Sequence, residues 1–304
     1  MLYRVFDAAE LPALVSAFMD GYEVVAPVKR GAHYSFEAIS SPDEMDLAYD
    51  TTLASPKRYF LPPTETLMRY NAATNEVADF QEEVVPRVIF GAHACDINAI
   101  NRLDLVFRDG RYPDPYYKAR RAATLIVGVS CSPDSDCFCN LWDADEARFG
   151  YDLFLHRLGD KYLVSISSVE AANILESAVD LRDATNEDRI EFRHATRARQ
   201  AAFNPDIPEI QDVLDPDGQT GERQRIWDAC TSPQFAVVAG GHNFRPTGRE
   251  RVRHRMYHKL NGFLATYDRM LCVGCGRCVK ACKADINPIR VLEFFEKKGA
   301  EGAC

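Results

Sequence analysis

The chain has 304 residues, of which 46% are hydrophobic and 27% are charged, so its composition is that of a globular protein with one large or two medium domains. Its formal net charge of -9 argues against nucleic-acid binding. The start of the chain lacks the basic segment and apolar core of a signal peptide, and no apolar run of about 18 residues is present to span a membrane. We therefore expect a cytoplasmic protein.

Helix and strand patterns alternate along the first two thirds of the chain, which predicts a layered α/β fold. Apolar runs at 84–91 and 124–129 are typical of buried strands, and the helical patterns between them favour a partly parallel sheet. The expected elements are a helix over 8–20, strands over 22–31 and 33–41, a strand over 84–91, a helix from Asp96 as its cap to Phe107, a helix over 114–123, a strand over 124–129, a hairpin over 150–168, a helix over 169–179 and a solvated helix or linker over 181–200.

Ten cysteines in a chain without a signal peptide indicate metal binding in a reducing compartment rather than disulfides. Cys272, Cys275, Cys278 and Cys282 stand in the order C-x2-C-x2-C-x3-C, the bacterial-type signature of cysteines that bind a [4Fe–4S] cluster. The glycines between them permit the tight loop that such a cluster needs. Zinc is the main alternative, but structural zinc sites usually divide their ligands into two separated pairs.

The fourth ligand of this cluster is open. In two-cluster ferredoxins the last cysteine of such a run binds the other cluster and is followed by Pro, whereas Lys283 follows Cys282 here. The chain contains no second run of this kind. Cys282, Cys230 or a more distant cysteine is therefore expected to complete the set begun by Cys272, Cys275 and Cys278.

Four further cysteines follow the ends of the two predicted buried strands. Cys95 comes after the first, and Cys131, Cys137 and Cys139 come after the second. Functional residues of α/β sheets gather beyond the carboxyl ends of strands, so these cysteines form a possible second metal or cluster site. The alternative is that they are small buried hydrophobic residues at a sheet edge.

A segment over 204–222, rich in Pro and Gly, predicts a linker loop. We accordingly expect an α/β domain over 1–203, the linker, and a small, mostly helical ferredoxin-like cluster domain over 223–304. The fold class is α/β (α+β).

Several stretches together resemble one known family: the iron–sulfur beta subunits of cytoplasmic sulfhydrogenase-type NiFe hydrogenases, with their relative, the corresponding iron–sulfur subunit of anaerobic sulfite reductase. The similarity extends from about Ser55 onward. The stretches are GAHACDINAINRLD, DPYYKARRAATLIVGVSC, DCFC, GYDLFL, RIWDAC, AGGHNFRP, HRMYHK and CVGCGRCVKAC.

The resemblance implies an electron-transfer subunit that lies between a flavin- and NAD(P)-binding reductase subunit, on one side, and a hydrogenase- or sulfite reductase-type catalytic subunit on the other. Members of the family usually carry an earlier C-x2-C-x2-C-x3-C-P run, but the corresponding segment here, PDIPEIQDVLDPDGQTGERQ, has no cysteine. One cluster motif is therefore missing. The chain also lacks G-x-G-x-x-G and G-x4-G-K-[ST] nucleotide fingerprints, which fits a partner that supplies flavin and nicotinamide.

Two alternatives to a non-catalytic electron relay remain. In the first, redox-active cysteines among Cys95, Cys131, Cys137 and Cys139 reduce sulfur or polysulfide. In the second, the cysteines bind zinc and stabilise an interaction module. In the relay hypothesis no residue of this chain is catalytic.

Overall fold

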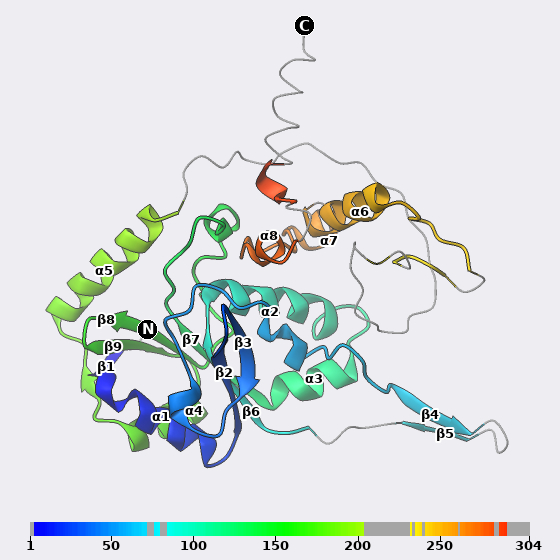
Figure 1. The fold of residues 1–304 in the computed structure, drawn as a ribbon. Helices are drawn as coiled ribbons and strands as arrows, with labels where there is room; N and C mark the ends of the chain where they lie inside the picture. Colours follow the sequence, from blue (N-terminus) through cyan, green and yellow to red (C-terminus); the bar gives the residue numbers. More distant parts are fainter. Residues whose placement is uncertain are drawn as a thin grey trace, which may run out of the picture. The chain divides into compact units, whose positions relative to one another are not determined.

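The computed structural model describes residues 3–71, 76–79, 84–203, 232, 235–238, 241–260, 262–282 and 286–290 (Figure 1). The chain divides into two compact units, and each is described by itself. The first consists of Met1–Phe60, Val84–Ile207 and Val273–Asn287, and the second of Leu61–Glu83, Pro208–Cys272 and Pro288–Cys304. This division does not show which parts of the chain fold by themselves, so the domain boundaries expected at 1–203 and 223–304 stay a prediction.

The first unit is built on a mixed sheet whose described strands number eight, in the order β10-β1-β9-β8-β7-β6-β2-β3. The central pairs β2–β6, β6–β7 and β7–β8 are parallel, and the outer pairs are antiparallel. The strands are β1 (Tyr3–Asp7), β2 (Glu23–Arg30), β3 (His33–Ala38), β6 (Arg87–Ala92), β7 (Thr124–Val129), β8 (Leu153–Leu158), β9 (Lys161–Ile166) and β10 (Arg182–Asp183).

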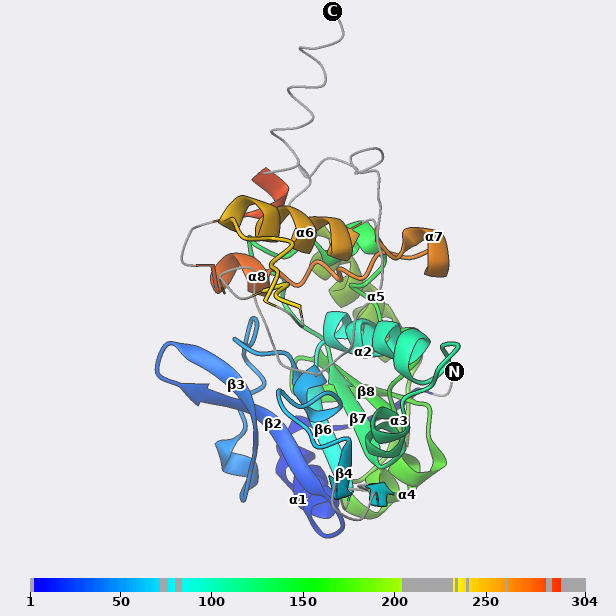
Figure 2. The same cartoon turned by 90° about the vertical axis from the view of Figure 1, so that its right-hand side faces the viewer.

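The expected α/β class is confirmed, with parallel strands where the sequence placed the two apolar runs. The hairpin of β2 and β3 forms one edge of the sheet (Figure 2) and turns at Gly31, whose φ of 61° suits glycine. The hairpin predicted over 150–168 is formed by β8 and β9 and turns at Gly159. The helices are α1 (Leu11–Met19), α2 (Ala94–Phe107), α3 (Pro115–Ala122), α4 (Val169–Ala178) and α5 (Asn186–Ala201).

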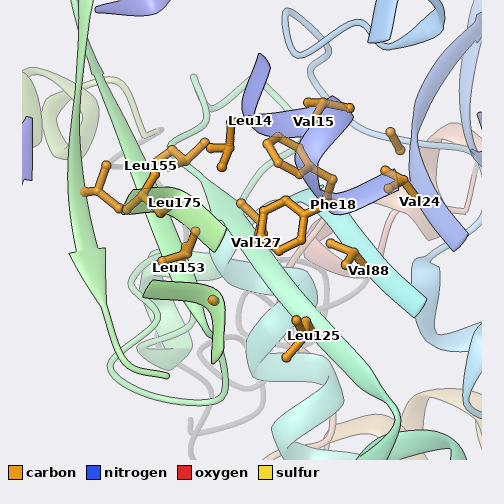
Figure 3. Packing of buried hydrophobic residues seen from close by; sticks show 14 of the residues in the cluster. Leu14, Val15, Phe18, Val24, Val88, Leu125, Val127, Leu153, Leu155 and Leu175 are labelled. Atoms are coloured by element: carbon orange, nitrogen blue, oxygen red, sulfur yellow. The ribbon is translucent and has the colours of Figure 1, made fainter. Parts of the chain in front are cut away.

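The hydrophobic core lies between one face of the sheet and the helices α1 and α4. Leu14, Val15 and Phe18 of α1 have no exposed surface, and they pack with Leu175 of α4 and alternate residues of β6, β7 and β8 (Figure 3). The apolar spacing of residues 8–20 is therefore the spacing of one buried helical face.

Helix α2 packs on the opposite face of the sheet. A Cβ on Gly128 of β7 would lie 2.8 Å from the Ile97 side chain of α2, so glycine lets the helix approach the strand closely. Polar contacts fix its far end, because the buried Asp104 carboxylate accepts a 2.7 Å hydrogen bond from Tyr117 of α3 and pairs with Arg108 and Arg121.

Side chains cap the starts of α3 and α4. Asp114 accepts a hydrogen bond from the Tyr117 N–H at the start of α3, and Ser168 accepts one from the Ala171 N–H at the start of α4. The expectation for α2 is wrong: its N-cap is His93, and Asp96 lies inside the first turn. There the Asp96 carboxylate pairs with Arg277, which is distant in the sequence.

In the second unit the described elements are the antiparallel pair β4 (Met68–Asn71) and β5 (Glu76–Asp79) and the helices α6 (Gly248–Leu260) and α7 (Leu264–Tyr267). Cys272 is anchored here, because its N–H donates a 3.1 Å hydrogen bond to the Lys259 carbonyl. The predicted linker 204–222 and Cys230 lie outside the described residues.

Candidate metal centre

Cysteines from three distant parts of the sequence lie together in the first unit. Cys95 and Cys139 are buried in one small apolar cluster with Val273, and Cys137 and Cys275 pack against that cluster. Three of the four strand-end cysteines and one cysteine of the carboxy-terminal run thus belong to this cluster or border it. The other apolar members of this cysteine cluster are Ala99, Ala144 and Phe203.

The sheet topology explains why the strand-end cysteines meet. Because β6 and β7 are parallel neighbours, the segments that follow them leave the same edge of the sheet. Cys95 lies in the first turn of α2 after β6, and Cys139 begins a short 3-10 helix, η4 (Cys139–Trp142), after β7. Cys131 stands at the exit of β7 and receives a hydrogen bond from Arg199 of α5.

The loop Val273–Asn287 is fitted against the segment that carries Cys137 and Cys139. The Phe138 N–H donates a 2.9 Å hydrogen bond to the Gly274 carbonyl. A Cβ on Gly274 would lie only 2.5 Å from the Phe138 oxygen, and one on Gly276 would lie 2.6 Å from the Asp136 oxygen. Both glycines also have positive φ values, 66° and 68°. Glycine is therefore required here for conformation and for space.

Two cations in helix α8 (Arg277–Lys280) join this loop to the rest of the unit. Arg277 forms a bidentate pair with Asp96, with distances of 2.8 and 2.7 Å between its guanidinium nitrogens and the two carboxylate oxygens. Lys280 pairs with Asp50 at 2.6 Å and with Asp134. The second of these carboxylates belongs to the segment that leads into Cys137.

Sequence reasoning missed this set of ion pairs. The only local signs were two basic residues: Arg277, directly before Cys278, and Lys280, two positions after Cys278. Their partners Asp50, Asp96 and Asp134 are distant in the sequence and stand in no recognisable motif.

Burial governs the protonation of the strand-end thiols. It raises the pKa of Cys137 to about 12, and it also raises the pKa values of Cys95, Cys131 and Cys139. Without a metal these groups are neutral thiols at pH 7, and a metal ion that binds them displaces their protons. Burial alone would raise the pKa of Asp96 as well, but the charge and hydrogen bonds of Arg277 outweigh it and lower that pKa.

His93 is a further buried group at the end of β6. Its ring stacks on Tyr49 with centroids 4.0 Å apart, while the Tyr49 hydroxyl donates a 2.6 Å hydrogen bond to the Gly91 carbonyl. Burial lowers the pKa of His93 to about 4, so the ring is neutral at pH 7. Its Nε2 atom is buried and has no hydrogen-bond partner among the described residues.

The donor geometry distinguishes two kinds of metal site. Among the described residues, no three His, Cys, Asp or Glu side chains converge as ligands of a single ion. A tetrahedral zinc site needs such convergence, whereas each cysteine of an iron–sulfur cube binds a different iron and stays farther from the others. All eight described cysteines are free thiols, and the Cys282 Sγ accepts a 3.4 Å hydrogen bond from the Ile286 N–H. The two groups of cysteines that gather at this apolar cluster supply the thiolate donors that an iron–sulfur cluster takes.

Comparison with known proteins agrees with this chemistry. Residues 207–286 match the model of a 4Fe-4S dicluster domain. The chain is 33% identical to sulfhydrogenase 2 subunit beta of Pyrococcus furiosus, over 96% of this chain and 98% of that protein. The chain belongs to the family of sulfhydrogenase beta-type iron–sulfur subunits. The similarity of this beta-type subunit to its relative reaches beyond the Ser55 start that the motifs had indicated.

This beta-type subunit is an electron-transfer protein that binds a [4Fe–4S] cluster, as its sequence predicted. The dicluster match covers all but the first two residues of the cysteine-free segment 205–224. In the part of the chain that the structure describes, no helix combines the length and apolar character that a membrane span requires.

Proposed function

We propose that this protein relays electrons between a flavin- and NAD(P)-binding reductase subunit, on one side, and a hydrogenase- or sulfite reductase-type catalytic subunit of a cytoplasmic complex on the other. The observation that carries the proposal is the packing of Cys275 with Cys95 and Cys139 in the same unit. It gathers two groups of soft thiolate donors in one water-poor place, as an electron path through the subunit needs. The relative's name, a subunit beta of a sulfhydrogenase, supports the assignment to a multi-subunit enzyme.

The proposed ligands of the first cluster are Cys272, Cys275, Cys278 and Cys282. Their order in the sequence supports the first three, and the Ile286 N–H that points at the Cys282 sulfur supports the fourth. Such N–H bonds to sulfur stabilise the more negative, reduced form. A [4Fe–4S] cluster, when bound, supplies a one-electron carrier. Cys230 is the competing fourth ligand.

The strand-end cysteines Cys95, Cys131, Cys137 and Cys139 are the proposed ligands of a second cluster. The Cys95 and Cys139 side chains are only 9% and 3% exposed, and the apolar members of the cysteine cluster keep water away. This burial argues against sulfur or polysulfide reduction at Cys95 and Cys139. A nucleophilic cysteine needs an accessible thiolate, whereas these two residues are buried and their thiols have raised pKa values.

The decisive experiment is metal and sulfide analysis of anaerobically purified full-length protein. We expect C278S and C139S each to lose about four iron and four sulfide per chain relative to wild type, since each variant removes a ligand of a different [4Fe–4S] cluster. C304S is the control and should keep its iron, because this cysteine belongs to neither set. Replacing Cys230 and Cys282 singly then identifies the fourth ligand of the first cluster.

Other results would select the alternatives. Zinc without inorganic sulfide, and no paramagnetic signal after dithionite, would establish the zinc-stabilised module. Unchanged iron in C137S and C139S together with lost sulfur reduction would establish the enzyme. The partners are tested by isolating the untagged chain from its native host, where a flavoprotein and a hydrogenase- or sulfite reductase-type subunit should co-purify with it.

A further inference from the structure

We infer that the buried Arg277–Asp96 ion pair sets the reduction potential of the cluster held by Cys275 and Cys278. Arg277 acts here as a positioning residue that supplies a fixed positive charge beside the cluster. The inference rests on the proposed function, because it requires a cluster at these cysteines. It concerns only residues of the first unit.

The pair is almost completely enclosed. The Asp96 side chain is 0% exposed and the Arg277 side chain 11% exposed. Besides the two contacts with Asp96, the guanidinium donates to the Thr52 carbonyl at 2.8 Å and to the Thr52 hydroxyl at 3.0 Å. Asp96 also accepts a 2.9 Å hydrogen bond from the Ser55 hydroxyl. The orientation of the guanidinium is therefore fixed by four hydrogen bonds, and it cannot turn away from its site.

The pair joins the two segments that carry these cysteines. Arg277 stands between Cys275 and Cys278 in the sequence, and Asp96 directly follows Cys95. Cys95 and Cys275 belong to the same packed cluster, so the contact between the charged side chains is also the contact between the two cysteine segments. Burial alone would lower the pKa of Arg277, but the charge and hydrogen bonds of Asp96 act against it, and the pKa stays above its usual value.

Reduction adds one negative charge to a cluster, so a nearby cation stabilises the reduced form and raises the potential. A charge in a buried, weakly polar place acts strongly over several ångströms, whereas a charge in contact with water is screened. Lys280 provides the comparison within the same loop. It is also close to Cys278 in sequence, but its side chain is 29% exposed and its partner Asp50 is 52% exposed.

An alternative role for Arg277 is purely mechanical, as a strap that holds the loop. The two roles separate in the conservative variant. R277K keeps a positive charge but loses the bidentate geometry, so it preserves the potential if charge matters. D96N keeps the guanidinium and its Thr52 hydrogen bonds while it removes the opposing negative charge, so it should move the potential upward.

The test is a redox titration of anaerobic full-length protein followed by electron paramagnetic resonance of the reduced cluster. At a fixed ambient potential we expect R277Q to lower the ratio of reduced to oxidised cluster about tenfold, which is a shift of about 59 mV for a one-electron couple. R277K and the matched control K280Q should stay within about threefold of wild type, since the first keeps the charge and the second removes a screened one. D96N should raise the ratio at least about threefold.

Equal potentials in wild type, R277Q and D96N, with the cluster signal present, would overturn the inference and leave the proposed function intact. The same holds if R277K lowers the potential as much as R277Q does, because charge would then not be the cause. Wild-type protein without iron and sulfide would instead overturn the proposed function. If R277Q does not fold, the opposite shift in D96N and the unchanged value in K280Q still decide the matter.

Discussion

Replacing Gly274 by Ala tests how tightly the cysteine loop is fitted to its neighbour. The added Cβ would lie 2.5 Å from the Phe138 oxygen and 2.6 Å from the Cys139 nitrogen, and both are backbone atoms that no side-chain rotation can move. The substitution also places alanine at a φ of 66°. Gly31 is the matched control, because its φ of 61° is similar and nothing lies within 4 Å of its added Cβ.

The expected free energies follow from these two environments. Alanine in the left-handed region costs about 1 kcal/mol, and undocking of the loop relieves this strain at Gly274 but not at Gly31, which lies in the β2–β3 turn. Overpacking against fixed atoms adds about 1–3 kcal/mol, and this too applies only at Gly274. The stiffer undocked chain of G274A offsets about 0.4–1 kcal/mol of this cost. The docked state of the loop should therefore be about 2 kcal/mol less stable in G274A than in G31A, roughly a 30-fold change in the docking equilibrium.

Thiol labelling of cluster-free protein measures this equilibrium. Cys139 is only 3% exposed while Gly274 contacts its segment, so it reacts with an alkylating reagent mainly when the loop has moved away. Mass spectrometry of the Cys139 peptide should show labelling roughly 30-fold faster in G274A than in G31A. Equal rates in the two variants, within about threefold, would refute the close approach of the two segments.

Three further predictions concern the frame that carries the site. F18A should lower the free energy of unfolding by about 3–5 kcal/mol, because Phe18 is fully buried, whereas F149A at a 56% exposed position should cost under about 1 kcal/mol in the same urea titration. Y117F should cost about 1–2 kcal/mol, since it leaves the buried Asp104 carboxylate without a 2.7 Å hydrogen bond; calorimetry at pH 7 should detect this as a lower Tm. The hydrogen bonds and ion pairs of Asp188 lower its pKa, so its stabilising effect is full above about pH 4 and is lost as the pH falls toward the folded-state pKa. D188N should therefore destabilise the protein at pH 7 but lose less stability than wild type on acidification. Parallel profiles of stability against pH in the two proteins would contradict this role of Asp188.

Local patterns predicted most of the frame because local forces decide those parts. The helical spacing of Leu14, Val15 and Phe18 fixes a buried face wherever the sheet lies, and both hairpins turn at glycines that the chain needs for positive φ. Asp96 shows the limit of such reasoning. Its place at the start of α2 suits a cap, but a buried carboxylate pairs with a cation if the fold supplies one, and Arg277 does so from 181 positions away.

The sequence alone determined the chemistry of this protein, since four cysteines at C-x2-C-x2-C-x3-C spacing can hold an iron–sulfur cube within one short loop. It also predicted the strands whose ends carry Cys95 and Cys131. Only the tertiary structure decided that Cys95, Cys137, Cys139 and Cys275 gather at one small apolar cluster, and that Arg277 lies beside Asp96. These contacts join segments more than a hundred residues apart. Their geometry comes from the parallel pairing of β6 and β7 and from Gly274 and Gly276, whose lack of a side chain lets the distant segments approach. No local sequence pattern encodes such an approach.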